Sequence, residues 1–247
     1  MSDLRSGRLA VWARAWLAGG GTAVAPDDVL DAVTGDDAPH AVTGIAGLGS
    51  LLDLLAAIRR EDAPVRLVLP AAGDVRGLPG PTEFRDAALA AGEAIVCGRL
   101  GAVPEIVEYY PSSRPTTVTW QVHTVDAVPG DYVPLADAQY ELATAIRESA
   151  STLAAADVGR WRDELGDLLA DARRAGERLV LPRDYPQRAV TLLAQAERMQ
   201  AVLDLAADDP VGGAVDQHGV AVRAGALRPL ATAVRRARLA AFNATAD

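Results

Sequence analysis

Residues 117–125 read Thr-Val-Thr-Trp-Gln-Val-His-Thr-Val, which is the clearest strand pattern in the chain. Val118, Trp120 and Val122 alternate with polar residues, and this period of two is typical of a β-strand with one buried and one wetter face. The stretch therefore predicts a β-sheet that is buried on one side.

Shorter apolar runs upstream are candidates for further strands. They lie at residues 40–43, 65–69 and 94–97, and each is followed by a glycine or a proline. Helical patterns occupy about residues 3–18, 26–34 and 51–60. The second of these begins with Pro26, Asp27 and Asp28, which suit the positive end of a helix dipole. Residues 1–130 therefore predict a mixed domain in which helices flank a sheet of three or four strands.

After the turn signal Pro129-Gly130 the apolar period changes from two to 3.6. Four amphipathic stripes follow, within residues 135–153, 161–172, 192–206 and 230–241, and Pro229 lies near the start of the last one. Each helix alone would leave its stripe in water, so residues 131–247 predict an antiparallel bundle of about four helices. The fold class predicted for the whole chain is α+β, with the small mixed sheet first and the helical bundle second.

Composition excludes several classes of protein. The 247 residues carry 33 acidic and 24 basic side chains, a net charge of -9, which argues against a general nucleic-acid binder. No apolar run reaches the ~18 residues that a membrane helix requires. One cysteine and three histidines cannot form an internal disulfide or the usual structural zinc sets. We therefore predict no metal, no cofactor, no nucleic acid and no membrane.

The first 25 residues allow two interpretations. Arg5, Arg8 and Arg14 precede a stretch of small residues ending in Ala23-Val24-Ala25, as in a secretion signal with its cleavage site. Against export, glycines 19–21 interrupt the apolar region and the preceding residues form a helical stripe. With one cysteine and no disulfide, a cytoplasmic location is expected.

The loop that follows residues 65–69 is the strongest candidate for a ligand site. Its polar and flexible positions are Gly73, Asp74, Arg76, Gly77 and Gly80, and a helix is expected to start at Pro81. A strand, a glycine-rich loop and a helix N-terminus can together surround an anion, which Arg76 could clamp with two hydrogen bonds. The glycine spacing matches no dinucleotide fingerprint or P-loop. Alternatively, Asp74 pairs with Arg76 and the loop is only a connection.

His123 could join that site as a general base, since it lies on the wetter face of the strand. No Gly-x-Ser-x-Gly motif accompanies it, and an ordinary strand histidine is the other interpretation. His40 and His218 look like loop residues. Cys97, at the end of a short strand, is expected to be a small buried residue rather than a nucleophile.

The last helix suggests a surface for partners. On a helical projection its apolar stripe lies opposite a second face of basic and apolar residues, formed by Arg228, Arg235, Arg236, Arg238, Leu239 and Phe242. Such a face suits docking on an acidic surface of another domain, a second subunit or another protein. A solvated arginine face is the alternative.

Several stretches together resemble conserved hypothetical proteins of actinobacteria. They are His40-Ala41-Val42-Thr43-Gly44, Leu67-Val68-Leu69-Pro70, Gly73-Asp74-Val75-Arg76-Gly77-Leu78-Pro79-Gly80, Gly92-Glu93-Ala94 and Val118-Thr119-Trp120. The resemblance implies a bacterial cytoplasmic protein. It carries over no catalytic residue.

No motif in the sequence identifies an activity, so two hypotheses stand. The first is a non-catalytic intracellular interaction or regulatory protein that uses its helical domain to bind a second copy or another protein. The second is an enzyme or binding protein for a small anionic ligand, with its site at the loop of residues 73–80. The sequence does not decide whether the protein is an enzyme.

Overall fold

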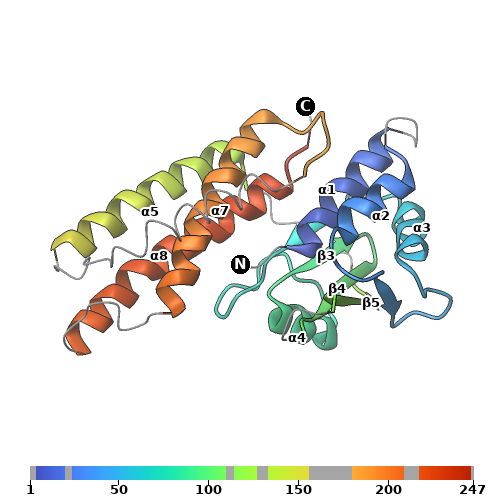
Figure 1. The fold of residues 1–247 in the computed structure, drawn as a ribbon, viewed down its shortest axis with the longest axis horizontal. Coiled ribbons are helices and arrows are strands. Elements are labelled where there is room, and N and C mark those ends of the chain that lie inside the picture. The colour runs from blue at the N-terminus through green and yellow to red at the C-terminus, as the bar shows by residue number, and fades with distance from the viewer. Residues whose placement is uncertain are drawn as a thin grey trace. The chain divides into compact units, whose positions relative to one another are not determined.

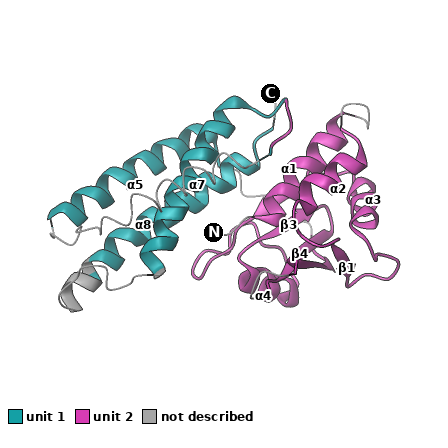
Figure 2. Cartoon of the chain, in the orientation of Figure 1, with its two compact units in different colours: residues 1, 132–180, 184–247 teal, residues 2–131, 181–183 magenta. Residues whose placement is uncertain are grey.

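The computed structural model describes residues 4–19, 24–109, 114–126, 133–155, 180–208 and 217–245. These fall into two compact units, one made of residues 2–131 and 181–183, the other of residues 132–180 and 184–247 with residue 1 (Figure 2). The first contains a mixed sheet and four helices, and the second contains helices alone in its described part (Figure 1). The predicted α+β class is confirmed.

The sheet has five strands in the order β1-β5-β4-β3-β2. The strands are β1 (Ala41–Thr43), β2 (Arg66–Val68), β3 (Ala94–Cys97), β4 (Leu100–Val107) and β5 (Thr117–Thr124). β1 runs parallel to β5, with Val42 opposite Trp120, and the other neighbours are antiparallel. The predicted alternation is present in β5, because Val118, Trp120 and Val122 are buried and the residues between them are only partly so.

The strand that the sequence analysis did not predict is β4, although it lies in the middle of the sheet. Gly101 and Pro104 interrupt its pattern, and a proline cannot donate a hydrogen bond to a sheet ladder. The proline is tolerated because pairing with β3 extends only from Leu100 to Ala102, so Pro104 lies beyond it. On its other side, Pro104 lies opposite Trp120 of β5.

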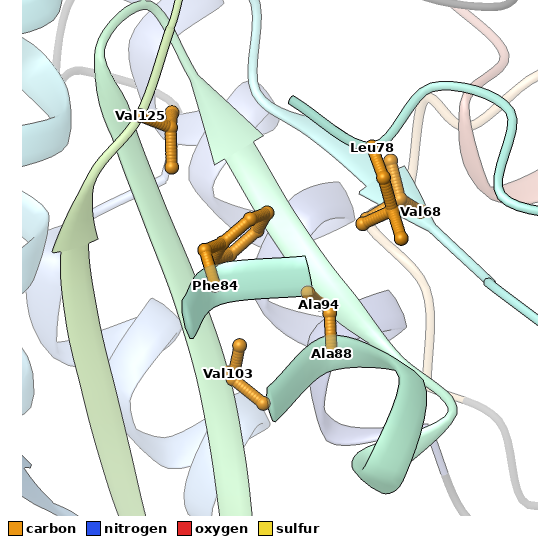
Figure 3. Packing of buried hydrophobic residues seen from close by; sticks show 7 residues of the cluster. All are labelled: Val68, Leu78, Phe84, Ala88, Ala94, Val103 and Val125. Atoms are coloured by element: carbon orange, nitrogen blue, oxygen red, sulfur yellow. The ribbon is translucent and has the colours of Figure 1, made fainter. Parts of the chain in front are cut away.

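This unit also contains four helices: α1 (Arg5–Ala18), α2 (Pro26–Thr34), α3 (Leu51–Glu61) and α4 (Thr82–Ala91). α2 packs on α1 and α3. α1 contacts β2, β3 and β4, and α3 contacts the edge strand β1. Phe84 and Ala88 of α4 pack on Val103 and Val125, as Figure 3 shows. Leu78, from the loop before α4, is buried in the same cluster beside Val68.

The helical unit contains α5 (Leu135–Ala155), α7 (Gln187–Asp208) and α8 (Gln217–Phe242). α8 packs against both α5 and α7. Glu141 of α5 pairs with Arg236, and Ser149 bonds to Ala226, so α5 and α8 run in opposite directions. The helix predicted within residues 161–172 lies outside the described residues. None of the described helices combines the length and apolar character needed to cross a membrane.

α8 begins well before Pro229, which therefore lies inside the helix and not near its start as we expected. Proline removes one helical hydrogen bond and crowds the carbonyl four residues earlier. That carbonyl belongs to Gly225, which has no side chain to add to the crowding. One residue further, the Ala226 carbonyl accepts a 2.8 Å hydrogen bond from the buried hydroxyl of Ser149 on α5. The packing of α5 thus supports the helix where proline weakens it.

Candidate functional site

The predicted ligand loop is folded onto itself by two tight turns. Ala71 and Asp74 exchange both backbone hydrogen bonds, at 3.0 and 2.9 Å, around a two-residue turn in which Gly73 has φ of +83°. A second turn is closed by the Leu78 N–H, which donates to the Val75 carbonyl at 3.2 Å. Gly77 lies within this second turn. Three N–H groups that could have faced an anion therefore bind the loop itself.

Asp74 and Arg76 form a forked pair within this loop. Nε and Nη2 of Arg76 donate to the two carboxylate oxygens of Asp74 at 2.8 and 2.7 Å. The Arg76 side chain is 52% exposed, so the pair lies at the surface. An anion that approached Arg76 from solvent would have to compete with the carboxylate that already occupies this edge of the guanidinium.

Gly80 and His123 have other neighbours. The Asp126 N–H donates to the Gly80 carbonyl at 3.1 Å, and a Cβ on Gly80 would lie 2.6 Å from the Asp126 carboxylate. The His123 ring packs edge-on against Phe84 at 5.7 Å, and its buried Nε2 has no hydrogen-bond partner. His123 is thus covered by α4, whereas Arg76 is bound to Asp74.

A polar cluster that sequence analysis did not single out connects α1 to β5 through the segment that precedes β1. The His40 side chain is fully buried, and its Nδ1 accepts a hydrogen bond from the Trp120 indole N–H at 3.1 Å. Its Nε2 lies 3.3 Å from the carboxylate of Asp37, which in turn accepts from Nε and Nη2 of Arg5 at 3.0 and 2.9 Å. A second cation, Arg8, approaches the same carboxylate at 3.7 Å. The parallel pairing of β1 with β5 brings His40 to Trp120, and no local sequence pattern indicates it.

The environment of this cluster shifts both of its titratable groups. Burial lowers the pKa of His40, and the nearby Asp37 carboxylate offsets this only in part. Burial alone would raise the pKa of Asp37, but hydrogen bonds and charge from Arg5, with help from His40 and Arg8, bring it below its usual value. Because Nδ1 accepts from Trp120, the neutral ring carries its proton on Nε2 and donates it to Asp37. Both ring nitrogens are occupied, so His40 is placed to anchor β1 and not to act as a base.

The arginines of α8 are engaged mainly within the helical unit. Arg238 pairs with Glu197 of α7 at 2.8 Å, and Arg236 pairs with Glu141 of α5 at 3.3 Å. Arg235 is partly buried and Arg228 is exposed. Leu239 and Phe242, which we expected on an accessible face, are only 9% and 1% exposed. A helical projection assigns residues to faces, but α8 has a helix on two of its faces and this end is covered all round.

Cys97 is buried, as predicted. Its Sγ donates to the Ala63 carbonyl at 3.2 Å. Burial, followed by the charge of Glu61, raises the pKa of the thiol to about 11. The thiolate needed for nucleophilic attack is therefore disfavoured. Within the ranges that the structure describes, no group of three or more His, Cys, Asp or Glu side chains is arranged to hold a metal ion.

Comparison with known proteins places this architecture in a family of two-domain proteins. Residues 6–134 match the family model described as Rv1486c-like protein, N-terminal domain, and residues 136–239 match the model of its C-terminal domain. No solved structure matches the chain.

Mycobacterial relatives match over almost the whole chain. The uncharacterized protein Rv1486c of Mycobacterium tuberculosis is 35% identical, and the uncharacterized protein ML1804 of Mycobacterium leprae is 33% identical. Each alignment covers 96% of this chain and 95% of the relative. The resemblance to actinobacterial proteins without an assigned activity is thereby confirmed. The chain belongs to the Rv1486c-like family.

Proposed function

We propose that this protein is a non-catalytic intracellular protein that acts by protein–protein association through its helical unit, and that it pairs with a second copy of itself. The observation that carries the proposal is an exposed tyrosine between opposite charges on the outer face of α5. The side chain of Tyr140 is 71% exposed. Tyrosine and arginine are enriched at protein interfaces, where a few such residues dominate the binding energy.

The outer face of α5 is opposite the residues that the helix buries. Ala138, Leu142, Ala145 and Ser149 form the buried stripe. At 100° per residue, Asp137, Tyr140 and Arg147 fall on the other side of the helix, and all three are exposed. Arg147 is directed along this face, because Nη2 donates to the Thr144 hydroxyl at 3.1 Å.

This face is complementary to itself. Asp137 and Arg147 lie at equal sequence distances on either side of Leu142. In an antiparallel pair of α5 helices with a twofold axis at the level of Leu142, each Asp137 would meet the Arg147 of the other copy, and Tyr140 would lie near the axis. A twofold interface requires such self-complementarity.

The polar groups that could have supported catalysis are largely engaged by other groups of the same chain. Arg76 is bound to Asp74, His40 to Trp120 and Asp37, and Cys97 has a raised pKa. Association is therefore better supported than chemistry at the loop of residues 73–80.

The test is a concentration series measured by size-exclusion chromatography with light scattering. We expect a mass near twice that of the 25.7 kDa chain. Tyr140→Glu and Asp137→Arg should each give monomers, and the charge exchange Asp137→Arg with Arg147→Asp should restore the dimer. Arg228→Glu, a similar change at an exposed arginine of α8, is the control and should leave the dimer intact.

A monomeric wild type at every concentration would exclude the self-association. A dimer that resists Asp137→Arg but dissociates with Arg228→Glu would place the interface on α8. A thermal-shift screen against small anionic metabolites separates the other hypothesis, because stabilisation lost in Arg76→Ala would support a ligand site in the loop.

A further inference from the structure

The cluster of Trp120, His40 and Asp37 has a geometry that only one protonation state of His40 can satisfy. The indole N–H of Trp120 is a donor and has no acceptor lone pair. Nδ1 of His40, 3.1 Å away, must therefore carry no proton. A second proton on the ring would place two N–H donors against each other in a site from which water is excluded.

The segment held by this bond has few other attachments to the sheet. β1 is an edge strand of three residues, Ala41–Thr43, paired with residues 119–121 of β5. The Ala38 N–H donates to the Thr116 carbonyl at 2.8 Å, and on the outer side the Val42 N–H donates to the Gly49 carbonyl at 3.3 Å. The His40 side chain adds the contact with the indole of Trp120, which is fully buried in the core.

We propose that the contact between Trp120 and His40 is an acid-sensitive latch, and that protonation of His40 releases residues 37–43, including strand β1, from strand β5. The released segment would uncover one edge of β5, while α4 and the hairpin of β3 and β4 remain in place.

Burial sets the direction of the response, and the charges around His40 modify it. Asp37, in the same segment, favours the protonated ring, whereas Arg5 and Arg8 of α1 oppose it. β5 contributes the neutral indole of Trp120. Burial is the largest influence, and the pKa of His40 in the folded protein lies below its ordinary value of 6.5. The unfolded or released state therefore binds more protons than the latched state as the pH falls below 6.5, and the latch weakens over that range.

Hydrogen exchange measured by mass spectrometry at pH 7 and pH 5 tests the latch. After correction for the intrinsic effect of pH, peptides covering residues 35–50 should exchange faster at pH 5. The increase should be up to about tenfold for each pH unit that lies between the pKa of His40 in the released state and its lower pKa in the latched state. Peptides covering residues 94–107 should not change. His40→Gln provides an acceptor and a donor that do not titrate, so it should remove the response. His218→Gln is the matched control and should retain it.

A second measurement does not depend on any variant folding. The C2–H resonance of His40 and the indole N–H resonance of Trp120 should titrate with the same midpoint, below 6.5. If the indole N–H stays protected while His40 becomes protonated, the latch is wrong. It is equally wrong if residues 35–50 still respond to acid in a folded His40→Gln variant.

Discussion

Arg238 of α8 donates from Nε to Oε1 of Glu197 on α7 at 2.8 Å, and the two side chains are only 8% and 11% exposed. In α8, Arg238 lies between Ala237 and Leu239, which are also buried. Two opposite charges at this depth favour one alignment of the helices, because any slip would leave each charge without its partner. Part of the basic face of α8 therefore contributes to the contact between α7 and α8 within the helical unit.

Arg238→Ala should destabilise the protein strongly, because it removes the cation that pairs with the buried Glu197 carboxylate. Removing one member of a buried ion pair typically costs about 3–5 kcal/mol. Urea unfolding followed by circular dichroism measures the loss. Arg228→Ala, at an exposed position of the same helix, should change the free energy of unfolding by less than about 0.5 kcal/mol. Equal effects at the two positions would contradict the buried pair.

Gly44→Ala should loosen the edge of the sheet. Gly44 has φ of +100°, and a Cβ there would overlap the backbone carbonyl of Val122. Gly47 has φ of +85° but open space around it, so Gly47→Ala should show the backbone strain alone, about 1–2 kcal/mol. Gly44→Ala should lower the free energy of unfolding by about 1–3 kcal/mol more than Gly47→Ala does, because the backbone at Gly44, directly after β1, must also move away from β5. Thermal unfolding of both variants tests the difference, and similar melting temperatures would argue against the close approach.

The parts of the fold that sequence analysis predicted are those set by local patterns. The alternation around Trp120 predicted β5 with its buried face, and Pro26 and Gly35 bracket the helix that the structure shows as Pro26–Thr34. β4 was missed because Pro104 argues against a central strand, and only the short pairing with β3 explains why it is tolerated.

Contacts between distant segments could not be predicted in this way. His40 does lie outside the helices and strands, as its sequence context indicated. Its contact with Trp120 was not predicted, because Trp120 is 80 residues away and is reached through a parallel strand pair. Similarly, the pattern of α8 showed which residues share a face with Leu239, but not that a second helix covers that face. Burial depends on how many helices and strands pack around a residue. A helical projection of one segment gives no information about these neighbours.

Cys97 should resist alkylation in the native protein. Its pKa of about 11 leaves roughly one thiol in a thousand ionised at pH 8, and the side chain is fully buried. Iodoacetamide at pH 8 should therefore label the protein only slowly, and addition of denaturant should make labelling complete. Mass spectrometry follows the modification. Rapid labelling of the native protein would mean that residues around Cys97 open readily.

Asp37→Asn should remove a stabilising charge and change the response to strong acid. The pKa of Asp37 is lowered from its ordinary value of 3.8, so the folded protein holds the carboxylate more strongly ionised than the unfolded chain does. Its contribution is therefore present above pH 3.8 and is lost as the pH falls further, through the folded pKa. Asp37→Asn should lower the free energy of unfolding at pH 7 by about 3 kcal/mol, because Arg5 and Arg8 lose the charge between them. It should also flatten the acid dependence below pH 3.8.

The control is Asp36→Asn, at the exposed neighbouring position, which should alter neither quantity. An acid profile of Asp37→Asn that matches the wild type would show that Asp37 does not stabilise the fold through its charge.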